Sequence, residues 1–234
     1  MLHSLDRRLL RAARDQATHL TGDPNHTVAA AAMDTLGRIH TGVNVHHFTG
    51  GPCAELVALG VATSAGAGPI VKMVAVGADG SVMPPCGRDR QVLMDQHPDC
   101  EVIVPTPDGE TAIPVRRLLP FAYIHPDSSP ERVVWFDGRY HAAIAAGHKT
   151  ATTRFDDPIA VGAAWFVFED ADTLKRLRAE ITSLEPRTMA TLTDDDARLE
   201  GCAAASELRD GLRGHYPDLA EDSPLTLVRF RIAQ

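Results

Sequence analysis

The residues most able to do chemistry lie in two short clusters, each where a helix is expected to begin. Cys53 stands two residues before Glu55, and Cys86 stands three residues before Asp89. Two sulfurs and a carboxylate can hold a zinc ion, and three protein ligands leave a fourth position open for water. Glu55 could carry protons between that water and a substrate. The clusters predict a catalytic zinc site with Cys53, Cys86 and Asp89 as ligands.

Asp89 is the unusual member of this set. The spacing of three residues places Cys86 and Asp89 on one face of a helical turn, and the partial positive charge of a helix N-terminus favours thiolate over thiol. Aspartate binds zinc at roughly 2.0–2.2 Å, against about 2.3 Å for sulfur. Two alternatives stay open: a site that has lost its metal, or an Asp89 that starts the helix and pairs with Arg88 or Arg90.

A second group of reactive residues lies between Gly147 and Arg154. A threonine hydroxyl needs a base to become a nucleophile, and a desolvated lysine can be that base. Lys149 and Thr152 are three residues apart and could converge at a bend, and Glu200 could orient the lysine. The alternative is a solvated edge strand, which a Lys-Thr-x-Thr stretch forms more often.

Hydrophobic spacing and turn residues predict the elements that position the first cluster. Strands that alternate with helices indicate an α/β layered domain. We expect helices over 2–20, from Pro52 to about Ala65, from Pro85 to about Gln96 and over 115–119, with strands over 27–33, 38–45, 70–76 and 101–104.

The polar stretch from His125 to Pro130 predicts a linker. Beyond it, Thr193 and Asp196 fit a capping box, and several strands with few helices suggest a small barrel-like domain. We expect helices over 138–146, 193–199 and 206–214, with strands over 150–154, 163–168, 178–184 and 225–232. The predicted organisation is a zinc domain over 1–125, a linker over 126–132 and a second domain over 133–234.

Composition limits the partners. The 234 residues are 44% hydrophobic and 23% charged, as in ordinary soluble proteins. The net charge of −8 divides into −3 up to residue 129 and −5 after it, so neither half has the basic excess that binds long nucleic acid. No apolar run approaches a membrane span and the N-terminus lacks a signal-peptide core, so we expect a cytoplasmic protein. Cys100 and Cys202 are expected to be small buried hydrophobes.

Longer stretches of the first half carry a family resemblance. Thr41–Gly60, Pro85–Pro98 and Leu118–Pro120 make residues 1 to about 125 resemble the cytidine deaminase family, and within it the blasticidin-S deaminases. The resemblance implies a three-layer α/β fold with helices flanking a mixed sheet, hydrolytic deamination of a cytosine ring, and commonly a tetramer. By motif match, Cys53 and Cys86 become zinc ligands and Glu55 the proton carrier.

Two positions depart from that family's pattern. Asp89 stands where the family has its third cysteine. His46 stands where ordinary cytidine deaminases have a glutamate that holds the ribose together with an asparagine, here Asn44. Asn44 can still donate and accept hydrogen bonds, but His46 is a different partner, so an unmodified ribose need not be the preferred group. His46 could instead face solvent or a neighbouring subunit.

The second half resembles the ASCH domain, a barrel related to RNA-binding PUA domains. The matching stretches are 146–154, 192–201, 215–218 and 228–230. One small ASCH-type enzyme removes the acetyl group from N4-acetylcytidine, and Lys149, Thr152 and Glu200 match its catalytic set. Other ASCH domains are thought to bind RNA or nucleotides without catalysis, which would make Arg139 and Arg154 phosphate or base contacts.

Together the resemblances predict a zinc-dependent hydrolytic deaminase of cytidine or a modified cytosine nucleoside, fused to an ASCH domain that binds or deacylates N4-modified cytidine. The fusion suggests that an N4 substituent is removed before the amino group. A homo-oligomer, dimer or tetramer, is expected. Two alternatives stay open: a catalytically degenerate protein that binds nucleosides or RNA, and a deaminase of a blasticidin-type antibiotic.

Overall fold

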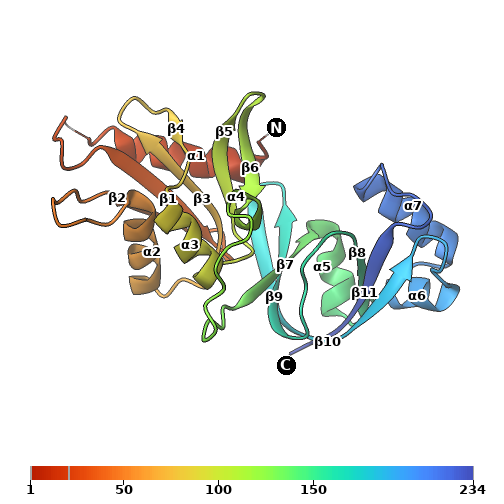
Figure 1. The fold of residues 1–234 in the computed structure, drawn as a ribbon. Coiled ribbons are helices and arrows are strands. Elements are labelled where there is room, and N and C mark those ends of the chain that lie inside the picture. Colours follow the sequence, from red (N-terminus) through yellow and green to blue (C-terminus); the bar gives the residue numbers. More distant parts are fainter. Residues whose placement is uncertain (1, 21, 234) are drawn as a thin grey trace. The chain divides into compact units, whose positions relative to one another are not determined.

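The fold is known from a computed structural model, which describes residues 2–20 and 22–233 (Figure 1). The chain forms two compact units. The first consists of Met1–Val133 with Glu169–Leu174, and the second of Val134–Phe168 with Lys175–Gln234. No helix among the described residues combines the length and the apolar character needed to cross a membrane.

The first unit is built on a mixed sheet with strand order β2-β1-β3-β5-β6, and β4 pairs with β3. β3 and β5 are parallel, whereas the other pairings are antiparallel. The strands are β1 Val28–Asp34, β2 Ile39–Val43, β3 Ile70–Gly77, β4 Val82–Met83, β5 Glu101–Thr106 and β6 Gly109–Pro114.

Helices flank this sheet, as expected from the sequence. They are α1 Ser4–Ala17, α2 Ala54–Ser64, α3 Gly87–Gln96 and α4 Val115–Leu118. α1 has a strong apolar stripe whose leucines are fully buried, and it packs against β1 and β3. α2 packs against β1 and β2, and α3 connects the parallel strands β3 and β5. The expected helices and strands are all present here; β4 and β6 were not predicted.

Small residues allow α2 to lie very close to the sheet. Ala54 and Ala58 of α2 share a buried core with Ala30 and Ala32 of β1. Gly42 of β2 touches the helix backbone so closely that a Cβ there would lie 2.5 Å from the Ala58 backbone nitrogen. The packing therefore fixes the position of the first turn of α2, where Cys53 and Glu55 lie.

The second unit contains a five-stranded sheet with order β7-β9-β10-β11-β8. Its strands are β7 Arg132–Asp137, β8 Ala151–Arg154, β9 Gly162–Asp170, β10 Thr173–Thr188 and β11 Pro224–Ile232. A short 3-10 helix, η1 Gly138–Tyr140, leads into α5 His141–Ala145, and α6 Asp194–Leu199 and α7 Ala205–His215 precede β11. The Thr193–Asp196 capping box predicted from the sequence is present. β7 was not predicted, and β10 is much longer than the expected strand over 178–184.

Candidate metal and catalytic site

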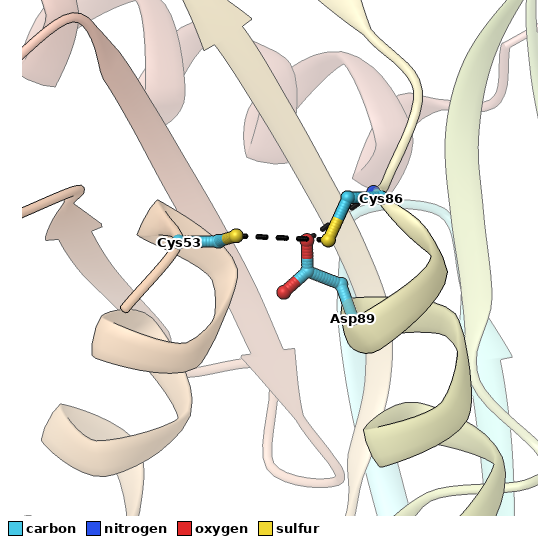
Figure 2. Close-up of side chains that lie close together, drawn as sticks. All are labelled: Cys53, Cys86 and Asp89. Atoms are coloured by element: carbon cyan, nitrogen blue, oxygen red, sulfur yellow. Dashed lines mark hydrogen bonds between the residues drawn. The ribbon is translucent and has the colours of Figure 1, made fainter. Parts of the chain in front are cut away.

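The first predicted cluster comes together between the starts of two helices (Figure 2). Cys53 is the N-cap of α2, Cys86 is the N-cap of α3, and Asp89 lies in the first turn of α3. The two Sγ atoms are 3.7 Å apart. One ligand atom from each of the three residues lies within 4.8 Å of the others, a spacing that could hold a metal ion.

The two oxygens of Asp89 have different surroundings. Oδ2 accepts a hydrogen bond from the backbone N–H of Cys86 at 3.2 Å. Oδ1 is buried and has no hydrogen-bond partner among the residues that the structure describes. A buried carboxylate oxygen without a partner is costly, and a bound cation would remove that cost.

The acids of the site are buried, and this changes the pKa values of its titratable groups. Burial, followed by the charge of Asp89, raises the pKa of the Cys53 thiol to about 12. The same two causes raise the pKa of Glu55 to about 7, opposed by a hydrogen bond to its own backbone. A divalent cation would lower both pKa values, because it stabilises the charged forms. The orphaned oxygen and these shifts show that the donor set fits a metal ion such as zinc.

The cluster lies in a pocket with a volume of about 240 Å³. Its lining includes every residue that the sequence analysis assigned to the first site: Asn44, His46, Cys53, Glu55, Cys86 and Asp89. Glu55 is 5% exposed and Asp89 is 1% exposed, whereas His46 is exposed. The pocket thus combines two buried acids with a half-buried thiol at Cys53, an exposed thiol at Cys86 and an exposed imidazole at His46.

Asn44 is held in one orientation by the chain around it. Its Oδ1 accepts hydrogen bonds from the backbone N–H groups of Thr27 at 2.7 Å and Val28 at 2.9 Å. Among the described residues, the amide NH2 has only a long contact of 3.5 Å with the Thr27 hydroxyl. Asn44 can therefore donate to a bound ligand, while its oxygen is already used.

The arginines next to Asp89 point elsewhere. Arg88 donates to the carbonyl of Gly51 at 3.0 Å, and Arg90 donates to the carbonyls of Pro85 and Leu118, both at 2.9 Å. Within the described chain no ion pair joins Asp89 to either arginine. The helix-start role considered for Asp89 is present, and the arginine pairing is not. Arg88, which the sequence suggested only as a partner of Asp89, instead holds the pocket residue Gly51 in place.

In the second unit the structure brings Lys149 and Glu200 together. Lys149 Nζ lies 2.7 Å from Glu200 Oε2, although 51 residues separate them. The hydroxyl that bonds to the other Glu200 oxygen belongs to Thr153 rather than to Thr152. Thr152 pairs with Val228 in the β8–β11 ladder, and neighbouring residues of a strand face opposite sides.

Strand β8 lies at the edge of its sheet, yet it is not solvated: Ala151, Thr152 and Thr153 are all buried. The alternative of a solvated edge strand is therefore wrong, because the strand lies at the edge of the sheet but its side chains are buried. The alternation of side chains along a strand places Thr153 and Thr152 on different faces, but it does not tell which of the two faces Glu200.

The two arginines proposed for the second site differ in availability. Arg154 donates to the Trp135 carbonyl at 2.7 Å, and its guanidinium lies 4.5 Å from the centre of the Phe136 ring. Arg139 is largely exposed and lies 2.8 Å from His215 Nε2 and 2.9 Å from the Tyr140 hydroxyl. Burial, followed by the charge of Arg139, lowers the pKa of His215. Arg139 is thus the more accessible cation.

Comparisons with known proteins place the first half in a family. No family model matches the chain. Blasticidin-S deaminase from Bacillus cereus is 30% identical over 128 residues, which cover 50% of this chain and 91% of that protein. Cytidine deaminase from Mycobacterium tuberculosis is 39% identical over 82 residues, which cover 34% of this chain and 61% of that protein.

Two solved structures are similar to parts of the chain. The crystal structure of cytidine deaminase from Mycobacterium tuberculosis is 30% identical and covers 50% of this chain and 95% of that one, with a TM-score of 0.44. An ASCH domain from Lactobacillus crispatus is 19% identical and covers 45% and 80%, with a TM-score of 0.38. On the sequence match to nearly the whole of blasticidin-S deaminase, the chain belongs, through its N-terminal half, to the family of blasticidin-S and cytidine deaminases.

Proposed function

We propose that the first unit is a zinc-dependent hydrolytic deaminase of cytidine or a modified cytosine nucleoside. One observation carries this proposal: the buried Glu55 shares a pocket with Cys53, Cys86 and Asp89, whose ligand atoms lie within 4.8 Å of one another. The activities named for the two relatives, blasticidin-S deaminase and cytidine deaminase, support the same chemistry.

Cys53, Cys86 and Asp89 would hold the zinc ion, which lowers the pKa of a bound water molecule to about 7. The pKa of Glu55 is raised to about 7 without metal, and the bound cation would lower it, so the ionised carboxylate is available to accept a proton from the water. It would carry one proton to the ring nitrogen and deliver another to the departing amine. The balance is a cytosine nucleoside and water giving a uracil nucleoside and ammonia.

The remaining lining residues would select the nucleoside. Asn44 offers its NH2 group to the sugar, since its oxygen is bound to the backbone of Thr27 and Val28. His46 adds an imidazole to the exposed part of the lining. The relative from Bacillus cereus supports a second candidate substrate, a cytosine nucleoside antibiotic of the blasticidin type.

For the second half we propose an ASCH domain over 133–234, with a barrel-like sheet, that binds or deacylates N4-modified cytidine. The meeting of Lys149 with Glu200 supports an active role, because the carboxylate orients the amine. Lys149 would take the proton of the Thr152 hydroxyl as its oxygen attacks the acyl carbon and pass that proton to the departing N4, which releases cytidine. Water would then hydrolyse the acyl-threonine, release the acid and restore the hydroxyl. Arg139 and Arg154 would contact the base or a phosphate, including that of RNA.

The proposal also includes a three-layer arrangement of the first domain over 1–125, a linker over 126–132, a cytoplasmic location and a homo-oligomer. Exposed apolar side chains of the first unit support self-association: Phe48 is 90% exposed and Val61 on α2 is 43% exposed. Size-exclusion chromatography with light scattering measures the oligomeric state directly.

The deciding experiment incubates purified protein with cytidine and, separately, with N4-acetylcytidine, while zinc content is measured by elemental analysis. We expect zinc to be bound, cytidine to give uridine, and N4-acetylcytidine to give uridine through cytidine. In a Glu55→Gln variant the second substrate should stop at cytidine, which isolates the deacylation step. A zinc-loaded protein that turns over neither nucleoside would be assayed next with a nucleoside of the blasticidin type. If it does not deaminate that nucleoside either, the result supports a catalytically degenerate binding protein.

A further inference from the structure

The two buried oxygens of Asp89 differ in their partners, because only one of them accepts a hydrogen bond. Oδ2 accepts from the Cys86 N–H and thereby caps α3. Oδ1 has no hydrogen-bond partner within residues 2–20 and 22–233. Figure 2 shows this second oxygen pointing away from the Cys86 backbone, into the space between the two helix starts.

No side chain of the described residues neutralises this carboxylate. The nearest arginines in sequence, Arg88 and Arg90, are turned to backbone carbonyls. The neighbouring Cys53 and Cys86 bring sulfurs, which add negative charge when they ionise. A cation bound from solution would therefore supply the positive charge that the buried Oδ1 lacks.

We propose that Asp89 divides its oxygens between two tasks: Oδ2 caps α3, and Oδ1 binds the metal beside the two sulfurs, which makes the site less selective for thiophilic cations than three thiolates would be. This inference rests on the zinc site of the proposed function and specifies how one residue serves it. Soft thiolate ligands favour soft cations, whereas carboxylate oxygens favour harder ones. The preference between Cd²⁺ and Zn²⁺ is thus set at Asp89.

Three substitutions separate the two tasks. Asp89→Asn keeps one carbonyl oxygen for the Cys86 N–H and replaces the metal-binding oxygen by an amide nitrogen. Asp89→Ala removes both functions. Asp89→Cys supplies a third sulfur and gives up the carboxylate cap. Asp95→Asn is the matched control, because it makes the same change of charge at the other end of α3.

Two measurements need no activity. Competition with a chromophoric chelator gives the Zn²⁺ and Cd²⁺ affinities, and absorption of the Co²⁺-loaded proteins reports how many thiolates bind. We expect Asp89→Asn to lose more than about 100-fold in Zn²⁺ affinity, beyond the loss typical of residues that only orient a ligand. Asp89→Cys should raise the affinity for Cd²⁺ relative to Zn²⁺ and intensify the thiolate-to-cobalt absorption.

The cap is tested on metal-free protein. Loss of a helix cap should lower the melting temperature of Asp89→Ala by about 2–4 °C, while Asp89→Asn and Asp95→Asn melt close to the unaltered protein. Full Zn²⁺ binding by Asp89→Asn, an unchanged Cd²⁺ preference in Asp89→Cys, or a metal-free wild-type protein would each overturn the proposal. A protein that binds metal as expected but leaves cytidine unchanged would overturn the deaminase assignment and leave the role of Asp89 intact.

Discussion

The Sγ atoms of Cys53 and Cys86 lie 3.7 Å apart, although the two residues are 33 positions apart and cap different helices. Each sulfur lies at a helix N-terminus, but burial and the charge of Asp89 outweigh the helix dipole at Cys53 and raise its pKa to about 12, so a bound cation is needed to ionise that thiol. Their approach depends on how α2 and α3 pack on the sheet, and not on the local spacing of either motif. The metal site is thus a property of the packed domain.

Glu55 should be replaceable by glutamine without loss of the fold. Glu55→Gln keeps the size of the buried side chain and removes its ability to exchange a proton. We expect kcat for cytidine to fall by about 10²- to 10⁴-fold, the usual contribution of a proton-transferring side chain. Steady-state kinetics, with zinc content measured on the same samples, checks this expectation.

The control for that variant is Asp95→Asn on α3, which changes a carboxylate outside the pocket lining. It should leave kcat within a factor of about two. Retained activity in Glu55→Gln, with zinc bound, would remove Glu55 from the reaction.

The sequence predicted most of the first unit because its signals are local. Proline and glycine mark the ends of α2, and the motif residues lie at expected helix starts. The sequence did not predict β6 Gly109–Pro114, whose residues are only partly buried and lack an apolar alternation. The orphaned oxygen of Asp89 was also beyond prediction, because it depends on the approach of α2.

In the second unit the sequence analysis expected Glu200 to orient Lys149, and the structure places the two side chains 2.7 Å apart. The hydroxyl that contacts Glu200 could not be predicted from the sequence. It belongs to Thr153 rather than to Thr152, and only the register of the strand decides between the two. β10 was underestimated because its sixteen residues mix charged and apolar types, and pairing with β11 keeps the strand extended.

Lys149 should matter for stability as well as for any chemistry. Lys149→Met would leave Glu200, whose side chain is 7% exposed, as an unpaired buried charge. Breaking a buried ion pair in this way costs about 3–5 kcal/mol. Urea unfolding followed by tryptophan fluorescence measures the second unit specifically, because the chain's two tryptophans, Trp135 and Trp165, both lie there.

A pair of threonine variants separates structure from catalysis at the same place. Thr153→Val removes a hydrogen bond to Glu200 and should cost about 1–2 kcal/mol. Thr152→Val should change stability little, yet abolish N4-acetylcytidine hydrolysis if Thr152 is the nucleophile. Unaltered hydrolysis in Thr152→Val, with hydrolysis lost in Thr153→Val, would transfer the role to Thr153.

His97 should make the first unit less stable in acid. Its Nδ1 accepts a hydrogen bond from the Ile70 backbone, and burial lowers its pKa from 6.5 to about 4. Between the two pKa values, His97 is protonated in the unfolded chain and neutral in the folded chain. The free energy of unfolding therefore falls as pH drops from about 6.5 to about 4. The loss is up to about 3 kcal/mol.

Hydrogen exchange of the β1 and β3 amides across this pH range measures the effect. His97→Gln should flatten the dependence, whereas His19→Gln, at an exposed histidine, should leave it unchanged. An equal slope in His97→Gln and the unaltered protein would contradict the assignment.

Gly42 of β2 should determine how closely α2 packs on the sheet, and thereby the position of Cys53 in the metal site. A Cβ there would lie 2.5 Å from the Ala58 nitrogen and 2.9 Å from the Ala54 oxygen, both backbone atoms that cannot turn aside. Gly42→Ala must therefore displace α2, and we expect a loss of about 1–3 kcal/mol together with weaker zinc binding. Gly60→Ala is the matched control, since no atom lies within 4 Å of its added Cβ; alanine should stabilise the helix by about 0.5–1 kcal/mol and leave zinc affinity unchanged. Hydrogen exchange and chelator competition on both variants decide the point, because equal zinc affinity in the two would show that the docking of α2 does not place Cys53.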